Sequence, residues 1–203
     1  PHVKSILEQM KELQIPACWC LASGFSESGA EGKKLQKEIT AYCEENHILL
    51  CGPNCIGVAN MTDKFAAFSV AINPNMRTGG VSAVMQSGAI LMGLANAARF
   101  GFRYLISAGN QAVLDISDYI GYLATDPETK VILAFVEGIP NAEKFIHAVR
   151  AAYQAGKPVL MLKVGRSEGA QRAVQAHTGS LAGSDSVLDA VLQKEGVIRL
   201  NSL

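Results

Sequence analysis

His177 is the strongest candidate for a reacting side chain in this sequence. It lies in Gln-Ala-His-Thr-Gly-Ser-Leu-Ala-Gly-Ser-Asp, residues 175–185. So many glycines and hydroxyls predict a loop rather than a helix or a buried strand. Glycine lets the backbone approach a ligand closely, and hydroxyls with free amides suit an anion such as phosphate. The loop therefore either presents an imidazole to such a ligand or only caps a helix expected at residues 187–194, with an incidental histidine.

Ser87 and Gly88 are the second candidate group. They follow an apolar strand expected at residues 81–85 and open an apolar helix that runs to Arg99. Unpaired amides and the helix dipole at such an N-terminus can hold a phosphate. The same small residues could instead serve only tight packing of a strand against a helix, and the sequence leaves both interpretations open.

Glu137 is the third candidate, because it ends an otherwise apolar strand expected at residues 131–136. A carboxylate there is either the first solvated residue or a partner for a group at the active edge. A histidine nucleophile needs one ring nitrogen tied to an acceptor so that the other keeps its lone pair. Glu137 is the best-placed carboxylate for that role, whereas His2, His47 and His147 stand in unremarkable surroundings.

The elements that must position these residues alternate along the chain. Apolar strands separated by helices predict a parallel sheet covered on both faces, with a ligand site beyond the carboxyl ends of the strands. The turns at 86–88, 108–110, 137–138 and 165–166 all fall at that edge. We expect strands at 17–22, 48–51, 81–85, 102–107, 131–136, 158–164 and 197–200, and helices at 2–13, 32–46, 116–124, 142–155 and 187–194.

A polar, turn-rich stretch at residues 73–80 predicts a boundary between two domains, 1–75 and 76–203. The first has a helix–strand–helix–strand order, which is half of a doubly wound sheet. We expect the other half upstream, and hence that the chain is a fragment of a longer protein.

Composition narrows the function classes. Lys and Arg total 18 and so do Asp and Glu, so no charge excess favours nucleic acid or an anionic membrane. No apolar run reaches the length of a membrane span, and no signal peptide is visible. The five cysteines form no disulfide framework or zinc-finger spacing, and we favour buried free thiols in a reducing, cytoplasmic setting over a metal site.

Several stretches together resemble the nucleoside-diphosphate-forming acyl-CoA synthetases, relatives of the succinyl-CoA synthetase alpha subunit. The most specific is His-Thr-Gly-Ser-Leu-Ala-Gly-Ser-Asp at 177–185. The others are Ser-Gly-Phe-Ser-Glu at 23–27, Gly-Pro-Asn-Cys-Ile-Gly at 52–57, Gln-Ser-Gly-Ala at 86–89, Ser-Ala-Gly-Asn-Gln at 107–111, Asp126-Pro127, Glu137-Gly138, and Lys163 with Gly165-Arg166.

The resemblance implies an α/β fold class and a reaction. Residues 1–75 would be the second half of a Rossmann-like CoA-binding domain, and 76–203 a flavodoxin-like parallel α/β domain that bears a phosphohistidine. In the family, acyl-CoA and phosphate give acyl phosphate and free coenzyme A. The phosphoryl group passes to a histidine and then to ADP or GDP, with Mg, on an ATP-grasp domain or beta subunit that this chain lacks. An oligomer follows as the expected assembly, with CoA and a small carboxylic acid as substrates.

The resemblance also implies roles for individual residues. His177 would carry the phosphoryl group and Glu137 would orient it. Ser23 and Gly24 would lie near CoA, and Asn54 and Met92 near the acyl end. No metal ligand is expected in this chain. Phosphate would be bound by Ser87, Gly88, Gly109, Asn110, Thr178 and Gly179.

Two other functions compete with this one. A chain of this architecture can be the CoA-binding regulatory module of a fused protein acetyltransferase, often without the histidine; the retained His177 and Glu137 argue against that. A flavin-binding flavodoxin-like domain is the other alternative. The loops hold no clustered aromatic residues to enclose a flavin ring, and Trp19 belongs to a predicted strand.

Overall fold

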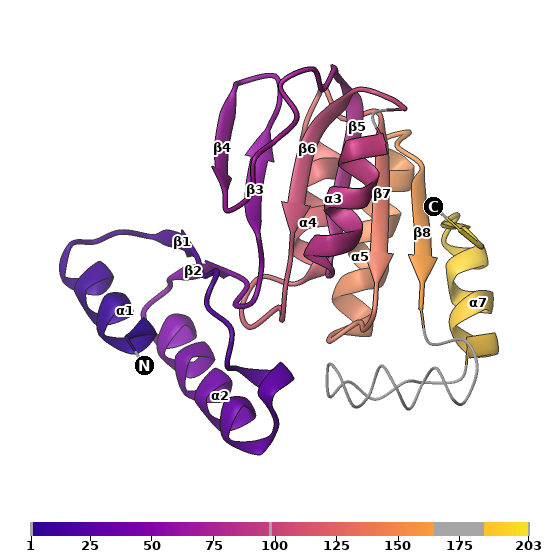
Figure 1. The fold of residues 1–203 in the computed structure, drawn as a ribbon. Coiled ribbons are helices and arrows are strands. Elements are labelled where there is room, and N and C mark those ends of the chain that lie inside the picture. Colours follow the sequence, from indigo (N-terminus) through magenta and orange to yellow (C-terminus); the bar gives the residue numbers. More distant parts are fainter. Residues whose placement is uncertain (1, 98, 165–184, 203) are drawn as a thin grey trace.

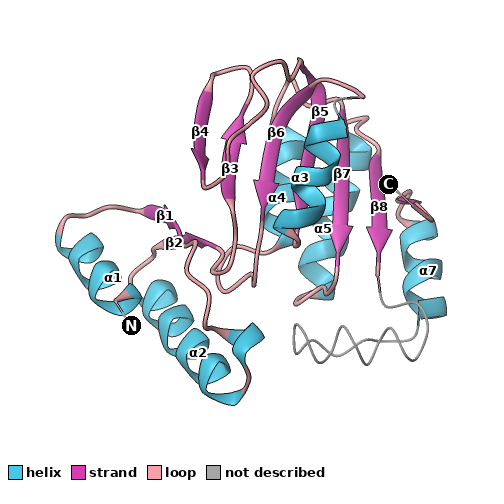
Figure 2. Ribbon diagram, in the orientation of Figure 1, coloured by secondary structure: helices cyan, strands magenta, loops and turns pink. Residues whose placement is uncertain are grey.

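The computed structural model describes residues 2–97, 99–164 and 185–202, and their elements form two sheets (Figures 1 and 2). The smaller sheet pairs β1 (Ala17–Trp19) with β2 (Leu49–Cys51) in parallel. Helices α1 (Val3–Glu12) and α2 (Ala30–Glu45) and the short 3-10 helix η1 (Ser26–Ser28) accompany it. Leu7, Phe25, Ile39 and Leu50 are buried in the core of this part.

The larger sheet has seven strands in the order β4-β3-β6-β5-β7-β8-β9. The strands from β6 to β9 in this order are parallel, as the alternation of strands and helices predicted. The first two, β4 and β3, run antiparallel to their neighbours. Their bounds are β3 (Gly57–Asn60), β4 (Phe65–Phe68), β5 (Thr78–Met85), β6 (Phe102–Ser107), β7 (Val131–Val136), β8 (Val159–Lys163) and β9 (Ile198–Arg199).

Helices cover both faces of the larger sheet, so its central strands are mostly apolar. Helices α4 (Ile116–Thr125) and α5 (Ala142–Gln154) lie on one face, and α3 (Gly88–Ala97) lies on the other (Figure 1). Successive side chains of a strand point to opposite faces. Val84 of β5 accordingly joins the core under α4 and α5, whereas Ala83 and Met85 join the core under α3. Helix α7 (Asp185–Lys194) lies beside β9.

Main-chain hydrogen bonds attach the smaller sheet to the larger one near the carboxyl end of β6. The Ala112 N–H donates to the Gly52 carbonyl at 2.9 Å, and the Leu114 N–H donates to the Leu50 carbonyl at 3.1 Å. The Cys51 thiol donates to the Ser107 carbonyl at 3.4 Å. These contacts fix the loop after β2 against the loop after β6, which sets one wall of the site described below.

The sequence pattern did not predict β3 and β4. Each is only four residues long, and neither carries a clear hydrophobic alternation. They precede the expected domain boundary at residues 75 and 76, yet β3 pairs with β6 of the larger sheet through Val58–Ile106, Ala59–Leu105 and Asn60–Tyr104. The boundary itself stays a prediction.

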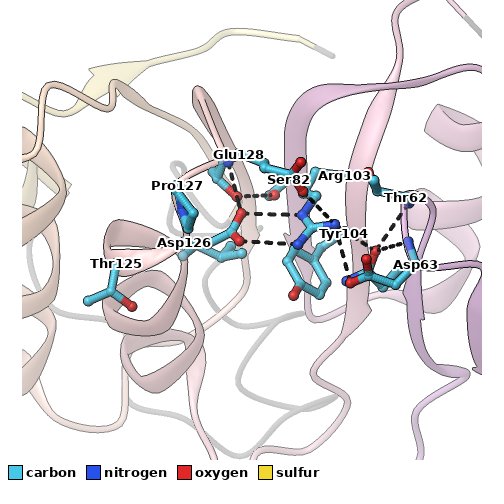
Figure 3. A network of polar contacts seen from close by, with 12 residues as sticks. Thr62, Asp63, Ser82, Arg103, Tyr104, Thr125, Asp126, Pro127 and Glu128 are labelled. Atoms are coloured by element: carbon cyan, nitrogen blue, oxygen red, sulfur yellow. Dashed lines mark hydrogen bonds and ion pairs between the residues drawn. The ribbon is translucent and has the colours of Figure 1, made fainter.

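A buried arginine organises the opposite, amino-terminal edge of the larger sheet (Figure 3). Arg103 of β6 is 7% exposed and pairs with Asp126, the C-cap residue of α4, at 3.3 Å between Nη2 and Oδ1. Its Nη1 donates to Asn60 Oδ1 of β3 at 3.0 Å and pairs with Glu128 Oε2 at 2.8 Å. The network therefore connects β3, β6 and the turn that leads into β7.

Among the described residues, no helix has both the length and the apolar composition that crossing a membrane requires.

Candidate active site at the carboxyl edge of the sheet

A cavity of about 910 Å³ opens at the carboxyl ends of β5, β6 and β7. Its walls come from both sheets: the segments after β1 and β2 on one side, and the turns after β5, β6 and β7 on the other. The cavity brings together seven of the residues that the sequence singled out: Ser23, Asn54, Ser87, Gly88, Gly109, Asn110 and Glu137.

Ser87 and Gly88 form the turn between β5 and α3. The Ser87 hydroxyl accepts a hydrogen bond from the Ile90 N–H at 3.4 Å, as expected of a residue that caps a helix. A Cβ at Gly88 would lie 2.8 Å from Cγ2 of Ile56. Close packing thus accounts for the glycine, while the helix N-terminus still faces the cavity. Phosphate binding at this turn stays a prediction.

Gly109 and Asn110 form the corresponding turn after β6. Gly109 has a φ of 57°, and a Cβ there would meet the Pro53 carbonyl oxygen at 2.2 Å, so only glycine fits. The Asn110 side chain accepts from Asn54 Nδ2 at 3.3 Å, and its own Nδ2 donates to Gln36 at 3.1 Å and to Glu27. Asn110 therefore ties the loops of the smaller sheet to the larger one.

Glu27 lines the cavity and was not among the expected site residues. Its Oε1 accepts hydrogen bonds from the Gly24 N–H at 2.6 Å and the Phe25 N–H at 3.2 Å. Burial raises the pKa of Glu27, but the hydrogen bonds from Asn110 and from these backbone groups outweigh it and hold the pKa below its ordinary value. The anionic form thus fixes the loop at residues 23–25.

Glu137 follows the last residue of β7 and lines the same cavity. Its N–H donates to Gln86 Oε1 at 2.6 Å, and its carbonyl accepts from Lys163 Nζ at 2.8 Å. Gln86 and Lys163 are both buried, and sequence reasoning quoted them only as parts of motifs. Their importance here depends on contacts between strands, which no local pattern reveals.

Five expected site residues either do not line the cavity or lie outside the described residues. Gly24 and Met92 are not among the residues that line the cavity, although Gly24 contacts Glu27 through its N–H. Met92 is half-buried on α3. His177, Thr178 and Gly179 lie outside the described residues, so their roles stay predictions.

All five cysteines are free thiols, and four of them are buried. Cys55 lines the cavity, where a hydrogen bond with Cys51 and burial raise its pKa. Desolvation of the thiolate favours the neutral thiol in such a setting. Within the described part of the chain, no three His, Cys, Asp or Glu residues form a group that could hold a metal ion.

Comparison with known proteins defines the class to which this fold and cavity belong. Residues 78–203 match the succinyl-CoA ligase like flavodoxin domain, and the chain belongs to that family. It is 33% identical to acetate–CoA ligase [ADP-forming] I of Archaeoglobus fulgidus over 99% of its own length and 29% of that protein. It is 34% identical to the alpha subunit of acetate–CoA ligase [ADP-forming] II of Pyrococcus furiosus, over 99% of its length and 44% of that subunit.

A solved structure extends the likeness to three dimensions. The dinucleotide forming acetyl-coenzyme A synthetase 1 of Ca. Korarchaeum cryptofilum, in complex with phosphate and ADP, superposes with a TM-score of 0.91 at 26% identity. The match covers 100% of this chain and 44% of that one. The chain thus spans less than half the length of each of these relatives.

Proposed function

We propose that this chain is the histidine-bearing part of an NDP-forming acyl-CoA synthetase. The enzyme would interconvert acyl-CoA, phosphate and ADP or GDP with a carboxylic acid, CoA and ATP or GTP. The observation that supports this most is the cavity itself, since motif residues from both sheets line it. The two curated relatives above are named as ADP-forming ligases of acetate and CoA, which supports the same reaction class.

The proposed reaction has three transfers. A phosphate oxygen attacks the thioester carbonyl, the carbon–sulfur bond breaks, and CoA leaves as the thiolate. The free imidazole nitrogen of His177 then attacks phosphorus, and the carboxylate leaves with the oxygen that joined it to phosphorus. Finally a terminal oxygen of ADP or GDP attacks the phosphohistidine, and the phosphorus–nitrogen bond breaks. Each transfer is reversible.

The cavity residues have distinct roles in this proposal. Glu137 accepts a hydrogen bond from one imidazole nitrogen, which fixes the tautomer and stabilises the charge that develops. The amides at Ser87 and Gly88 hold the phosphate, because a helix N-terminus presents unpaired N–H groups and a positive dipole end. Gly109, Asn110, Thr178 and Gly179 complete the phosphate site, Ser23 and Gly24 contact CoA, and Asn54 and Met92 lie toward the acyl group.

The nucleotide and its magnesium would bind a partner, either an ATP-grasp domain or a beta subunit. Two findings support this division. The Pyrococcus furiosus relative is itself named a subunit alpha, and the Korarchaeum relative was solved with ADP and phosphate. We expect the complete enzyme to be an oligomer.

Labelling with radioactive ATP tests the proposal. In the enzyme assembled with its nucleotide-binding partner, we expect a phosphoryl group on His177 that acid removes and alkali leaves in place. A phosphoserine ester at Ser180 or Ser184 would behave in the opposite way. His177→Ala should take up no label, whereas His147→Ala, which alters an exposed histidine of α5, should label as the unmodified chain does. An acid-stable label, or full labelling of His177→Ala, would contradict the mechanism.

A further inference from the structure

Two buried side chains hold the main chain of Glu137 and Gly138 from opposite sides. Gln86, which follows β5, accepts from the Glu137 N–H at 2.6 Å and from the Gly138 N–H at 2.9 Å through Oε1. Its Nε2 donates to the Gly138 carbonyl at 2.6 Å. Lys163, the last residue of β8, donates from Nζ to the Glu137 carbonyl at 2.8 Å.

These contacts take the place of the regular hydrogen bonds between strands, which stop where β7 ends. β7 ends at Val136, so the N–H and C=O groups of residues 137 and 138 lose regular strand partners. Main-chain groups that are partly shielded from water still need hydrogen-bond partners, and here side chains at the ends of the two neighbouring strands supply them. Gln86 is 8% exposed and Lys163 is 9% exposed, so water does not compete freely for these bonds.

The consequence concerns the Glu137 carboxylate. Because both of its peptide groups are held, Glu137 leaves β7 in one direction, toward the cavity that it lines. A side chain must be held closely for productive transfer, since a displacement of about 1 Å can cost roughly 100-fold in rate.

We propose that Gln86 and Lys163 are positioning residues that aim Glu137 at the phosphoryl-accepting histidine. The inference rests on the proposed function, because it acts through the role of Glu137 in that reaction. Neither side chain needs to touch the substrate. Both act on the backbone of the residue that orients the imidazole.

Steady-state kinetics of the assembled enzyme test the inference with Gln86→Met and Lys163→Met. Methionine has about the length of glutamine and is one atom shorter than lysine. Gln86→Met removes the hydrogen bonds to residues 137 and 138, and Lys163→Met removes the one to the Glu137 carbonyl. We expect kcat for acyl-CoA-dependent phosphoryl transfer to fall by roughly 10- to 100-fold. The KM for acyl-CoA should stay unchanged, because the groups proposed to bind CoA are untouched.

Ser82→Ala is the matched control. Ser82 is a fully buried residue of β5, the strand that Gln86 follows. Its hydroxyl lies 2.8 Å from Thr129 Oγ1, near the amino-terminal edge of the sheet. It also loses a buried hydrogen bond, so it reproduces a general loss of stability without touching Glu137. We expect it to keep the kcat of the unmodified enzyme.

Combining Gln86→Met with Glu137→Gln separates this inference from the proposed function. If Gln86 acts through Glu137, the double variant should be as slow as Glu137→Gln alone, because the second change removes nothing further. Turnover of Glu137→Gln at the unmodified rate would remove Glu137 from the proposed reaction. A slow Glu137→Gln with a normal Gln86→Met, or losses that multiply, would overturn the positioning role.

Gln86→Glu serves if Gln86→Met does not fold. Its carboxylate can still accept from the N–H groups of Glu137 and Gly138, and only the donor to the Gly138 carbonyl is lost. A smaller fall in kcat than that of Glu137→Gln, again at unchanged KM, is the expected result. A rise in KM without a fall in kcat would contradict the positioning role.

Discussion

At the scale of single residues, Glu27 is the anchor of the proposed CoA loop. Its carboxylate accepts from the N–H groups of Gly24 and Phe25 and from Asn110. Hydrogen bonds to a charged group contribute about 1.5–3 kcal/mol each, so their loss should release the loop. We predict that Glu27→Ala raises the KM for CoA by roughly tenfold or more while kcat changes less.

Initial-rate measurements over a range of CoA concentrations in the assembled enzyme check this. Glu31→Ala is the control, because Glu31 is an exposed residue in the first turn of α2 and does not line the cavity. An unchanged KM for Glu27→Ala would show that the loop does not depend on this carboxylate.

Replacing glycine by alanine should lower the stability of the fold at Gly109 and raise it at Gly121. Gly109 has a positive φ and would place a Cβ 2.2 Å from a carbonyl oxygen, so Gly109→Ala should destabilise the fold by more than about 1 kcal/mol. Gly121 lies inside α4 with nothing within 4 Å of an added Cβ. Gly121→Ala should stabilise by roughly 0.5–1 kcal/mol, because alanine suits a helix interior. Urea denaturation measures both, and equal effects would contradict the argument.

The residues of the site differ in how far the sequence could predict them. Ser87, Gly88, Gly109, Asn110 and Glu137 lie in the turns that follow strands, so the strand pattern and the motifs were enough to place them at one edge. Gln86, Lys163 and Glu27 act through hydrogen bonds to main-chain groups of other segments. Such partners depend on strand order and on the register of the sheet, which spacing along the chain does not determine.

At the scale of elements, the regular alternation made most helices and strands predictable. Each parallel strand is a short apolar run bounded by turn residues, and each helix has an apolar stripe. The sequence pattern did not predict β3 and β4, because an antiparallel pair at a sheet edge needs neither a long apolar run nor a crossover helix. Strand β4 pairs with β3, and β3 is held beside β6 by partners distant in sequence, such as Asn60 with Arg103.

The Arg103 network should make the stability of the fold depend on pH. Burial raises the pKa of Asp126, but hydrogen bonds from Thr129 and Arg103 outweigh it and leave the pKa below its ordinary value. A carboxyl whose pKa is lowered by folding stabilises the native state above its unfolded pKa, about 3.9, and loses that effect as pH falls through the folded pKa. We predict that Asp126→Asn lowers the unfolding free energy at pH 7 by about 1.5–3 kcal/mol.

Denaturation curves of the two proteins at neutral and acidic pH measure this difference. The difference in unfolding free energy between the two proteins should shrink as the Asp126 carboxyl becomes protonated, because all other titrating groups are common to both. Glu143→Gln is the control: its contact with His147 is 4.0 Å long on an exposed face of α5, and its loss should leave the curve unchanged. A gap that stays constant with pH would assign the effect of Asp126→Asn to packing alone.

At the scale of the whole molecule, the cavity lies between the two sheets and is lined by residues from both. The smaller sheet contributes Ser23 and Asn54, and the larger contributes Ser87 and Glu137. Neither sheet forms the cavity alone, which is why the motifs are scattered from residue 23 to residue 138. The proposed reaction uses two sites. The acyl phosphate reacts with His177 in the cavity of this chain, whereas the nucleotide reacts with the phosphohistidine on the partner.

This division predicts which donors can label the 203-residue chain by itself. Acetyl phosphate should phosphorylate it without nucleotide, because the proposed phosphate site and His177 both belong to this chain. Radioactive ATP should label it only after the nucleotide-binding partner is added, since the transfer from ATP needs a site that we place on the partner. Acid and alkali treatment of chain labelled from each donor measures the outcome, with His177→Ala expected to stay unlabelled by both. Rapid labelling by ATP alone would place the nucleotide site on this chain, and labelling by neither donor alone would show that the partner completes the phosphate site as well.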